Sequence, residues 1–299
     1  MRNFGSLLAL STALLMTACS SAEVETSPTS KAETAQTAMT ALPALKDYIA
    51  CLPQETALVA AHRGSAYDTQ YPENSMSALK ALLEKGFLVS EIDVAGLKDG
   101  MHILYHDGVW DEKSTGKGPI ASTTWEDAQK ILLKDTNGDF SADRPVKFED
   151  YILAVKGKMY LEVDFKSSSN YETVIELLRK HDMADQVILI SYNEGQTKKL
   201  SSLAPEMMLS VGSREALGQT RFGPDQVAAW VGYRVDDMGL IQALRDKDIP
   251  ILGRVRKDWG LQAADAADLL VTDNVFDHQP IAGLTDANRG KLESCLAKL

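Results

Sequence analysis

The sequence predicts an α/β protein whose folded part is a closed (β/α)8 barrel, preceded by an export signal and a flexible tether. Three observations support this prediction. Short apolar runs alternate with helical patterns through the chain, which is typical of a parallel sheet covered by helices. The folded part holds about 250 residues, the usual size of one such barrel. The hydrophobic content of 44 % is enough for a single core.

Apolar runs of four to seven residues, bounded by Gly, Pro or charge, are typical of buried strands. Eight such runs predict barrel strands over residues 57–61, 88–94, 102–105, 159–165, 187–191, 207–211, 249–254 and 269–271. A further apolar stretch, 227–233, is either a ninth strand or part of a helix. Helices are expected over residues 75–85, 125–133, 171–181, 194–203, 238–247 and 261–267. The Gly- and Asp-rich region 107–150 is expected to form loops over the barrel mouth.

Residues 1–18 have the pattern of a signal peptide, with Arg2 at its start and an apolar run that is too short to span a bilayer. The run ends in Leu15-Met16-Thr17-Ala18-Cys19, which resembles a bacterial lipobox. That resemblance implies a protein anchored to the membrane through a lipidated Cys19 and facing the periplasm. The alternative is ordinary cleavage near Ala18, which would leave a periplasmic protein with a plain thiol at Cys19.

Residues 19–43 contain almost no large apolar side chains, so they predict a flexible tether between the signal and the domain at 44–299. The formal net charge is −11, and the domain has no cluster of Lys and Arg, so nucleic acid is excluded as a partner. Cys51 and Cys295 lie at opposite ends of the domain. A closed barrel brings its termini together, so these residues are either a disulfide or two buried thiols.

Carboxylates occur in two of the predicted strands. Side chains alternate across a strand, so Glu91 and Asp93 share one face, as do Glu162 and Asp164 with Lys166. In a barrel this face is the interior, where several carboxylates cannot all remain ionised without a counter-charge. We therefore expect one divalent cation, Mg²⁺ or Ca²⁺, since both prefer oxygen ligands.

Two histidines follow apolar runs and are expected at the barrel rim. His62 and His106 can serve as the proton acceptor and the proton donor of one reaction, while Arg63 and Lys166 provide positive charge for an anionic phosphate. Together with the cation, these groups indicate phosphodiester cleavage. Asp273, after the last predicted strand, is interpreted as the cap of a turn.

The motifs resemble those of the glycerophosphodiester phosphodiesterases in order and spacing. The matching segments are His62-Arg63-Gly64, Pro72-Glu73-Asn74-Ser75, Glu91-Ile92-Asp93-Val94, Asp99-Gly100, His106-Asp107, Ser114-Thr115-Gly116-Lys117-Gly118, Asp164-Phe165-Lys166 and Val271-Thr272-Asp273. The resemblance implies a phospholipase-C-like TIM barrel with His62 and His106 as acid and base. It also implies metal ligands at Glu91, Asp93 and a carboxylate of the 159–165 strand, phosphate contacts from Arg63 and Lys166, and supporting roles for Glu73 and Asn74.

Three segments depart from this family pattern. Asp164 stands where the family has Glu, and Glu162 faces the same way, so either or both can supply the third ligand. Leu97 replaces a Thr. A late Trp-Thr-Val-Asn run is Gly253-Arg254-Val255-Arg256 here, which adds positive charge near the mouth and leaves substrate choice open.

The predicted function is metal-dependent hydrolysis of a small glycerophosphodiester to an alcohol and glycerol 3-phosphate. The attacking group is either water or a substrate hydroxyl. One alternative is an enzyme like phospholipase D or sphingomyelinase D that acts on intact lipid, for which a wide apolar mouth is expected. The other is a lipoprotein that binds a phosphorylated headgroup without catalysis. Retention of both histidines argues against it, because binding alone needs no acid and base.

Overall fold

A computed structural model describes residues 42–65, 70–218, 226–255 and 264–299, and these residues belong to one structural unit. The predicted signal peptide, Cys19 and nearly all of the tether lie outside the described residues. None of the helices in the described part is both long and apolar enough to cross a bilayer.

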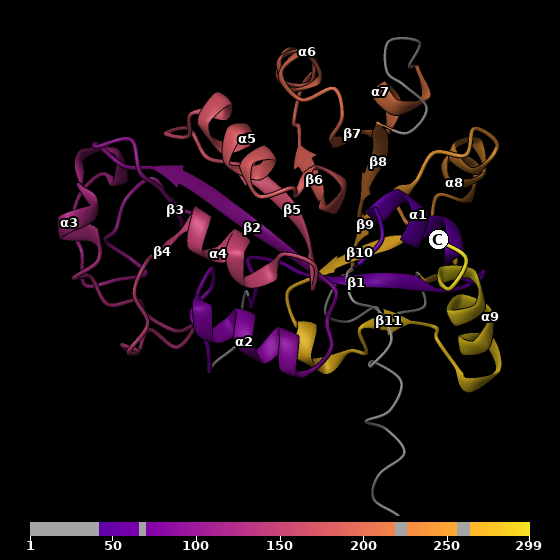
Figure 1. Cartoon of the computed structure of the whole chain (residues 1–299), viewed down its shortest axis with the longest axis horizontal. Helices are drawn as coiled ribbons and strands as arrows, with labels where there is room; N and C mark the ends of the chain where they lie inside the picture. Colours follow the sequence, from indigo (N-terminus) through magenta and orange to yellow (C-terminus); the bar gives the residue numbers. More distant parts are fainter. Residues whose placement is uncertain (1–41, 66–69, 219–225, 256–263) are drawn as a thin grey trace, which may run out of the picture. The chain divides into compact units, whose positions relative to one another are not determined.

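Eight parallel strands form a closed barrel with helices around it, which confirms the predicted barrel architecture (Figure 1). Their order is β1-β10-β9-β8-β7-β6-β5-β2, and pairing of β2 with β1 closes the ring. The strands are β1 (Ala57–Ala61), β2 (Val89–Gly96), β5 (Tyr160–Phe165), β6 (Val187–Ile190), β7 (Met208–Gly212), β8 (Val227–Gly232), β9 (Ile251–Arg254) and β10 (Leu269–Thr272). The open alternative for residues 227–233 is thereby settled as a barrel strand.

The prediction of a barrel strand over residues 102–105 is wrong. This segment forms β3 (His102–Leu104), which pairs antiparallel with the far end of β2 and then with β4 (Val146–Lys147). Only five residues connect β2 to β3, and they include a turn at Gly100 with φ of 83°. A parallel neighbour needs a crossover of about a dozen residues, so a hairpin is the only connection that this length allows.

Most of the predicted helices are present, often with a side chain that caps the first turn. Ser75, Asn170, Asn193 and Asp237 each accept a hydrogen bond from a backbone N–H three residues later. The predicted helix at 125–133 is much shorter than expected, and the one at 261–267 falls partly outside the described residues. The α-helices are α1 (Leu45–Cys51), α2 (Met76–Glu84), α3 (Trp125–Ala128), α4 (Phe148–Val155), α5 (Tyr171–Lys180), α6 (Glu194–Leu203), α7 (Ser213–Leu217), α8 (Met238–Arg245) and α9 (Asp286–Leu296). Short elements are η1 (Ile120–Ser122), η2 (Ala184–Gln186), η4 (Val275–Asp277) and β11 (Ile281–Ala282).

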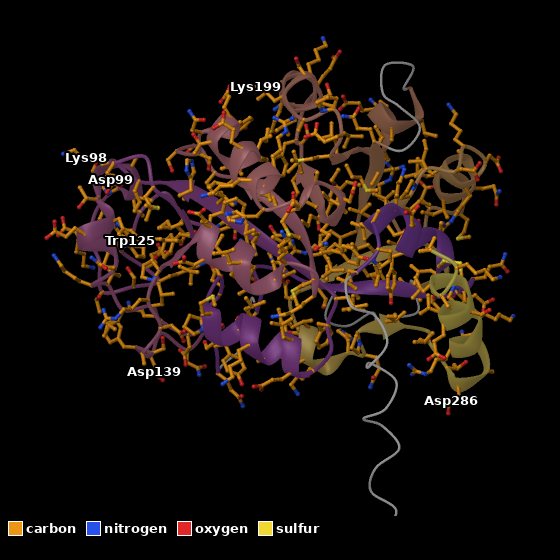
Figure 2. The ribbon with its side chains drawn as sticks, viewed as in Figure 1. Lys98, Asp99, Trp125, Asp139, Lys199 and Asp286 are labelled. Carbon is orange, nitrogen blue, oxygen red and sulfur yellow. A yellow bond between two sulfur atoms is a disulfide. The ribbon has the colours of Figure 1, made fainter. Side chains whose placement is uncertain are left out.

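The region between β3 and β4 has a small core of its own. Trp110 is fully buried and packs with Ile103, Tyr105, Ile120 and Leu133. Figure 2 shows Asp99, from the turn between β2 and β3, close to Trp125 of this region, and the backbone N–H of Trp125 donates a hydrogen bond of 2.8 Å to Asp99 Oδ2. The region is therefore more ordered than the loops expected from its composition.

Side chains of the barrel strands alternate between two hydrophobic clusters. One cluster gathers inward-facing residues from the beginnings of the strands, such as Leu58, Val89 and Tyr160, and α1 packs on them through Leu45 and Tyr48. The other lies between the strands and the surrounding helices. Every second residue of a strand points inward. A side chain that lies two or four positions after one of these inward-facing apolar residues therefore also points into the barrel, and this relation is called inward parity below.

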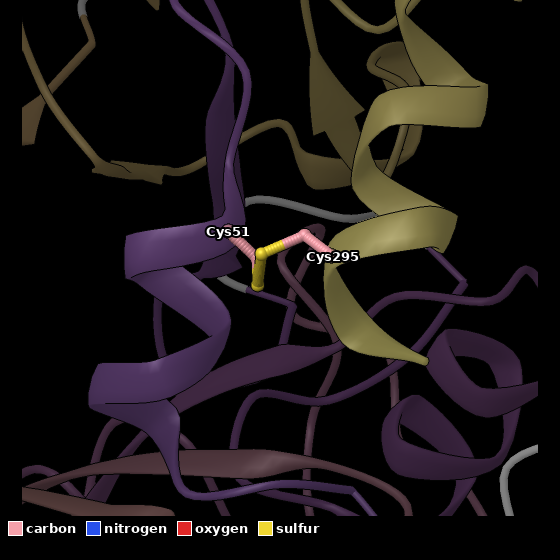
Figure 3. Close-up of a disulfide and its surroundings, with 2 residues drawn as sticks. All are labelled: Cys51 and Cys295. Atoms are coloured by element: carbon pink, nitrogen blue, oxygen red, sulfur yellow. A yellow bond between two sulfur atoms is a disulfide. The ribbon is translucent and has the colours of Figure 1, made fainter. Parts of the chain in front are cut away.

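A disulfide joins α1 to α9 at the end of the barrel where the strands begin (Figure 3). The Cα atoms of Cys51 and Cys295 are 5.5 Å apart, within the range that a disulfide requires. Of the two alternatives, the disulfide is thus confirmed, and it closes a loop with a sequence separation of 244 residues.

Reducing this disulfide is expected to lower the free energy of unfolding by up to about 5 kcal/mol, because the bridge restricts the unfolded chain over a very long loop. Urea unfolding with and without reductant measures the effect. The Cys51→Ser/Cys295→Ser double variant is the control and should match the reduced protein under both conditions. Equal midpoints for the oxidised protein and the double variant would contradict the expected stabilisation.

Candidate active site

Four buried carboxylates lie on two neighbouring strands. The parallel register of β2 and β5 pairs Glu91 with Glu162 and Asp93 with Asp164. Val89 and Tyr160 begin the two inward-facing series, so all four carboxylates point into the barrel. Each of the four residues is at most 5 % exposed. This local concentration of acid is too costly for a structural core and identifies the functional end of the barrel.

Three of these carboxylates are close enough to share one ion. Oxygen atoms of Glu91, Asp93 and Asp164, called the carboxylate cluster below, all lie within 4.8 Å of one another. Asp164 Oδ1 is buried and has no hydrogen-bond partner among the described residues. An unpaired buried carboxylate oxygen in such a cluster fits a hard divalent cation, which binds oxygen ligands.

Glu162 lies outside the carboxylate cluster, two residues before Asp164 on β5 and in register with Glu91 of β2. Its Oε2 is also buried and has no hydrogen-bond partner within the segments that the structure describes. Burial and then the nearby Asp164 raise the pKa of Glu162 to about 8. Burial and the neighbouring Asp93 likewise raise the pKa of Glu91 well above its usual range. Without an added positive charge, some of these carboxyl groups therefore favour the protonated form.

Lys166 and the loop that follows β1 compensate part of the negative charge of these carboxylates. Lys166 Nζ lies 2.7 Å from both Asp93 Oδ1 and Asp164 Oδ2. The backbone N–H of Arg63 donates a hydrogen bond of 2.7 Å to Glu91 Oε2. The hydroxyl of Tyr192, which follows β6, donates to Asp164 Oδ2 at 2.8 Å. Tyr192 was missed by sequence reasoning, although its parity with the inward-facing Ile188 places it on the same face.

Glu73 and Asn74 support the site from the segment before α2. Asn74 has a φ of 57°, and its side chain exchanges two hydrogen bonds with Asp93, one to Oδ2 at 2.8 Å and one from the backbone N–H at 3.1 Å. Glu73 accepts hydrogen bonds from Arg63 at 3.2 Å and from Lys113 at 2.7 Å. Both residues therefore contact other groups of the candidate site, and Lys113 adds a cation that was not predicted.

His62 follows β1 and faces the carboxylate cluster. Its Nδ1 lies 2.6 Å from Asp273 Oδ1, and its Nε2 lies 3.9 Å from Glu91 Oε2. An ionised carboxylate only accepts hydrogen bonds, so the short contact requires a proton on Nδ1. Burial, together with Arg254 and Arg63, lowers the pKa of His62 despite the opposing effect of Asp273. The neutral ring then presents the lone pair of Nε2 to the site.

His106 is arranged in the same way, although it follows the antiparallel β3 and not a barrel strand. Its Nδ1–H donates to Asp107 Oδ1 at 2.7 Å, and its Nε2 accepts a hydrogen bond of 2.7 Å from Arg63 Nη2. Burial alone would raise the pKa of Asp107, but the hydrogen bond from His106 and the charge of Lys113 keep it below its usual range. Each histidine thus has an aspartate on Nδ1.

The interpretation of Asp273 as a turn cap is wrong. Asp273 Oδ1 accepts hydrogen bonds from His62 and, at 2.7 Å, from Arg254 Nη2. Burial tends to raise the pKa of Asp273, but these two hydrogen bonds outweigh it, and the pKa lies below its usual range. The inward parity of Val271 and Leu252 points to Asp273 and Arg254 as interior residues, a signal that the sequence interpretation did not use.

Comparison with known proteins identifies the family to which this chain is similar. The model of the "Glycerophosphoryl diester phosphodiesterase family" matches residues 62–229. A "Glycerophosphodiester phosphodiesterase" of Caldanaerobacter subterraneus subsp. tengcongensis is 27 % identical over 161 residues, which are 52 % of this chain and 65 % of the relative. The alignment thus spans slightly less than two thirds of that relative.

Solved structures share the fold at low sequence identity. A glycerophosphoryl diester phosphodiesterase from Parabacteroides distasonis has a TM-score of 0.69 and 20 % identity, covering 86 % of this chain and 93 % of that one. An Oleispira antarctica phosphodiesterase, solved in complex with the product sn-glycerol-3-phosphate, has a TM-score of 0.58 and 20 % identity, covering 84 % and 99 %. Because the family model spans more than half of the sequence and includes both histidines, this chain belongs to the glycerophosphoryl diester phosphodiesterase family.

Proposed function

We propose that this protein hydrolyses small glycerophosphodiesters to an alcohol and glycerol 3-phosphate, with one divalent cation, Mg²⁺ or Ca²⁺. The observation that carries the proposal is that two histidines, each paired with an aspartate, lie at the same end of the barrel as the carboxylate cluster. The positively charged side chains of Arg63 and Lys166 lie there too. Binding without catalysis needs no such pair of histidines. The product named for the Oleispira structure supports glycerol 3-phosphate as the product here.

Glu91, Asp93 and Asp164 would hold the cation, and Glu162, in register with Glu91, is a further candidate ligand. The unpaired Asp164 Oδ1 supports this assignment, because this carboxylate oxygen accepts no hydrogen bond from the described part of the site. When bound, the cation supplies a Lewis acid that stabilises negative charge on the phosphoryl oxygens.

His62 acts as the base in this proposal. Its Nε2 takes the proton from the attacking oxygen, which belongs to water or to a neighbouring hydroxyl of the substrate, as the new P–O bond forms. Attack by a substrate hydroxyl gives a cyclic phosphate, which water then opens at the same site. The Nδ1 contact with Asp273 supports this role, because it leaves the Nε2 lone pair free.

His106 acts as the acid and gives a proton from Nε2 to the departing alcohol oxygen as the old P–O bond breaks. Arg63 Nη2 donates to His106 Nε2 in the structure, so Arg63 must turn to the phosphate before Nε2 can carry that proton. Arg63 and Lys166 then hold the phosphoryl oxygens by charge-assisted hydrogen bonds.

Export and lipidation are part of the proposal. The residue pattern of 1–18 and the position of Cys19 support a lipoprotein that faces the periplasm. The disulfide supports an oxidising compartment, because structural disulfides are rare in the cytosol.

Activity should require both histidines and a divalent cation. His62→Ala and His106→Ala are each expected to lower kcat by about 10²-fold or more, the usual scale for a general acid or base. Glycerol 3-phosphate release from a panel of diesters, with and without chelator, measures this. His181→Ala is the matched control, since His181 pairs with Glu149 outside the site and should retain full activity.

Near wild-type turnover in either histidine variant, or turnover unaffected by chelator, would rule the proposal out. Cleavage of intact phospholipid but of no small diester would instead favour the enzyme that acts on lipid. Binding of headgroups without turnover would favour the non-catalytic lipoprotein.

Metal titration should separate the two carboxylates of β5. Asp164→Asn is expected to weaken divalent-cation binding by about 10-fold or more, since removing a metal-site partner has effects of that order. Glu162→Gln should have the smaller effect, because its oxygens lie outside the carboxylate cluster. Calorimetric titration of Mg²⁺ and Ca²⁺ measures both, with Glu149→Gln as the control outside the site. A larger effect from Glu162→Gln would reverse the assignment.

A further inference from the structure

We propose that Arg254 is a positioning residue, which together with Asp273 holds the His62 imidazole with its proton on Nδ1 and its Nε2 lone pair toward the carboxylate cluster. The consequence for catalysis rests on the proposed function, in which His62 is the base. The arrangement of the ring is a property of the protein itself and can be measured without any substrate.

The contacts of three groups define the arrangement. Asp273 Oδ1 lies 2.6 Å from His62 Nδ1 and 2.7 Å from Arg254 Nη2, and Arg254 Nη2 lies 3.2 Å from His62 Nδ1. A guanidinium can only donate and an ionised carboxylate can only accept. Two competing hydrogen bonds to Nδ1 are therefore conceivable, one in which Nδ1–H donates to Asp273 and one in which Nδ1 accepts from Arg254.

The distances decide between the two. A carboxylate oxygen at 2.6 Å from an unprotonated Nδ1 would bring two lone pairs together, so the proton lies between them. The shorter contact of Arg254 Nη2 is also with Asp273, which directs its N–H away from Nδ1. Asp273 thus determines the tautomer, and Arg254 holds the aspartate where it can do so.

The position of Arg254 is itself well determined. It is the last residue of β9, in register with Val271 of β10, two residues before Asp273. Its guanidinium carbon lies 5.8 Å from the centroid of the Tyr233 ring, within the range of a cation–π contact. Its Nε is buried and makes no hydrogen bond within the described part of the chain. The strand end, the aromatic ring and Asp273 therefore fix this side chain.

Loss of either residue should disturb the ring in a different way. Without the Asp273 carboxylate, Arg254 becomes the nearest partner of Nδ1, and the neutral ring should carry its proton on Nε2 instead. Without the Arg254 guanidinium, Asp273 loses its second hydrogen bond and is free to rotate, and the two tautomers should mix. Replacing a surface arginine that contacts neither residue should leave the tautomer of His62 unchanged.

Long-range ¹H–¹⁵N NMR of the ring nitrogens, above the usual pKa of histidine, tests these expectations. The His62 signals are assigned from their loss in His62→Gln. Wild type should have a protonated Nδ1 and an unprotonated Nε2, Asp273→Ala should have the reverse, and Arg254→Met should have averaged signals. Arg234→Met is the matched control, because this exposed arginine pairs with Asp237 and should leave the His62 signals unchanged. Wild-type signals in Arg254→Met would overturn the proposal.

Kinetics on a glycerophosphodiester provide the second readout. Arg254→Met is expected to lower kcat by about 10-fold or more with KM within about 2-fold, the pattern of a group that acts on the reactive step. Arg254→Lys keeps a cationic donor and should recover part of kcat, which also excludes misfolding as the cause. A raised KM with unchanged kcat would make Arg254 a substrate-binding residue and overturn the proposal. If wild type cleaves no diester, the proposed function fails, while the NMR result still decides the role of Arg254.

Discussion

The carboxylates that face one another across β2 and β5 are the constraint on which the rest of this end of the barrel depends. Their register puts Glu91 beside Glu162 and Asp93 beside Asp164 in a space where none is more than 5 % exposed. Desolvation and mutual repulsion both oppose ionisation there, and the raised pKa of Glu162 and Glu91 reflects this. Such a core is tolerated only where positive charge compensates it, and a divalent cation would complete that compensation.

The neighbouring groups compensate this negative charge or orient the carboxylates. Lys166 bridges two of the carboxylates, and Asn74 fixes the orientation of Asp93 through two hydrogen bonds. Each of the two histidines has an aspartate of its own, Asp273 for His62 and Asp107 for His106, which accepts the Nδ1 proton. The Nε2 atoms then face the site, where the proposed mechanism uses them for proton transfer.

Local patterns were sufficient to predict the barrel architecture and the residues proposed for its chemistry, because both predictions depend on short apolar runs and on residues adjacent to them. The error over residues 102–105 arose because a short apolar run has no direction, and only the length of the connection after Gly96 excludes a parallel strand. Strand parity could have indicated the interior position of Asp273. Its pairing with His62, 211 residues away, depends on closure of the barrel, which brings β10 beside β1, and was missed because Asp273 was interpreted from its local pattern alone.

The central claim is that the carboxylate cluster binds the catalytic cation between the two histidines. A crystal structure with Mn²⁺ and glycerol 3-phosphate tests this most directly, since Mn²⁺ shares the oxygen-ligand preference of Mg²⁺ and is visible by anomalous scattering. The account predicts an anomalous peak in contact with Glu91, Asp93 and Asp164, with the phosphate lying between the metal, Arg63 and the Nε2 atoms of His62 and His106. A metal bound elsewhere, or a phosphate distant from both histidines, would contradict it.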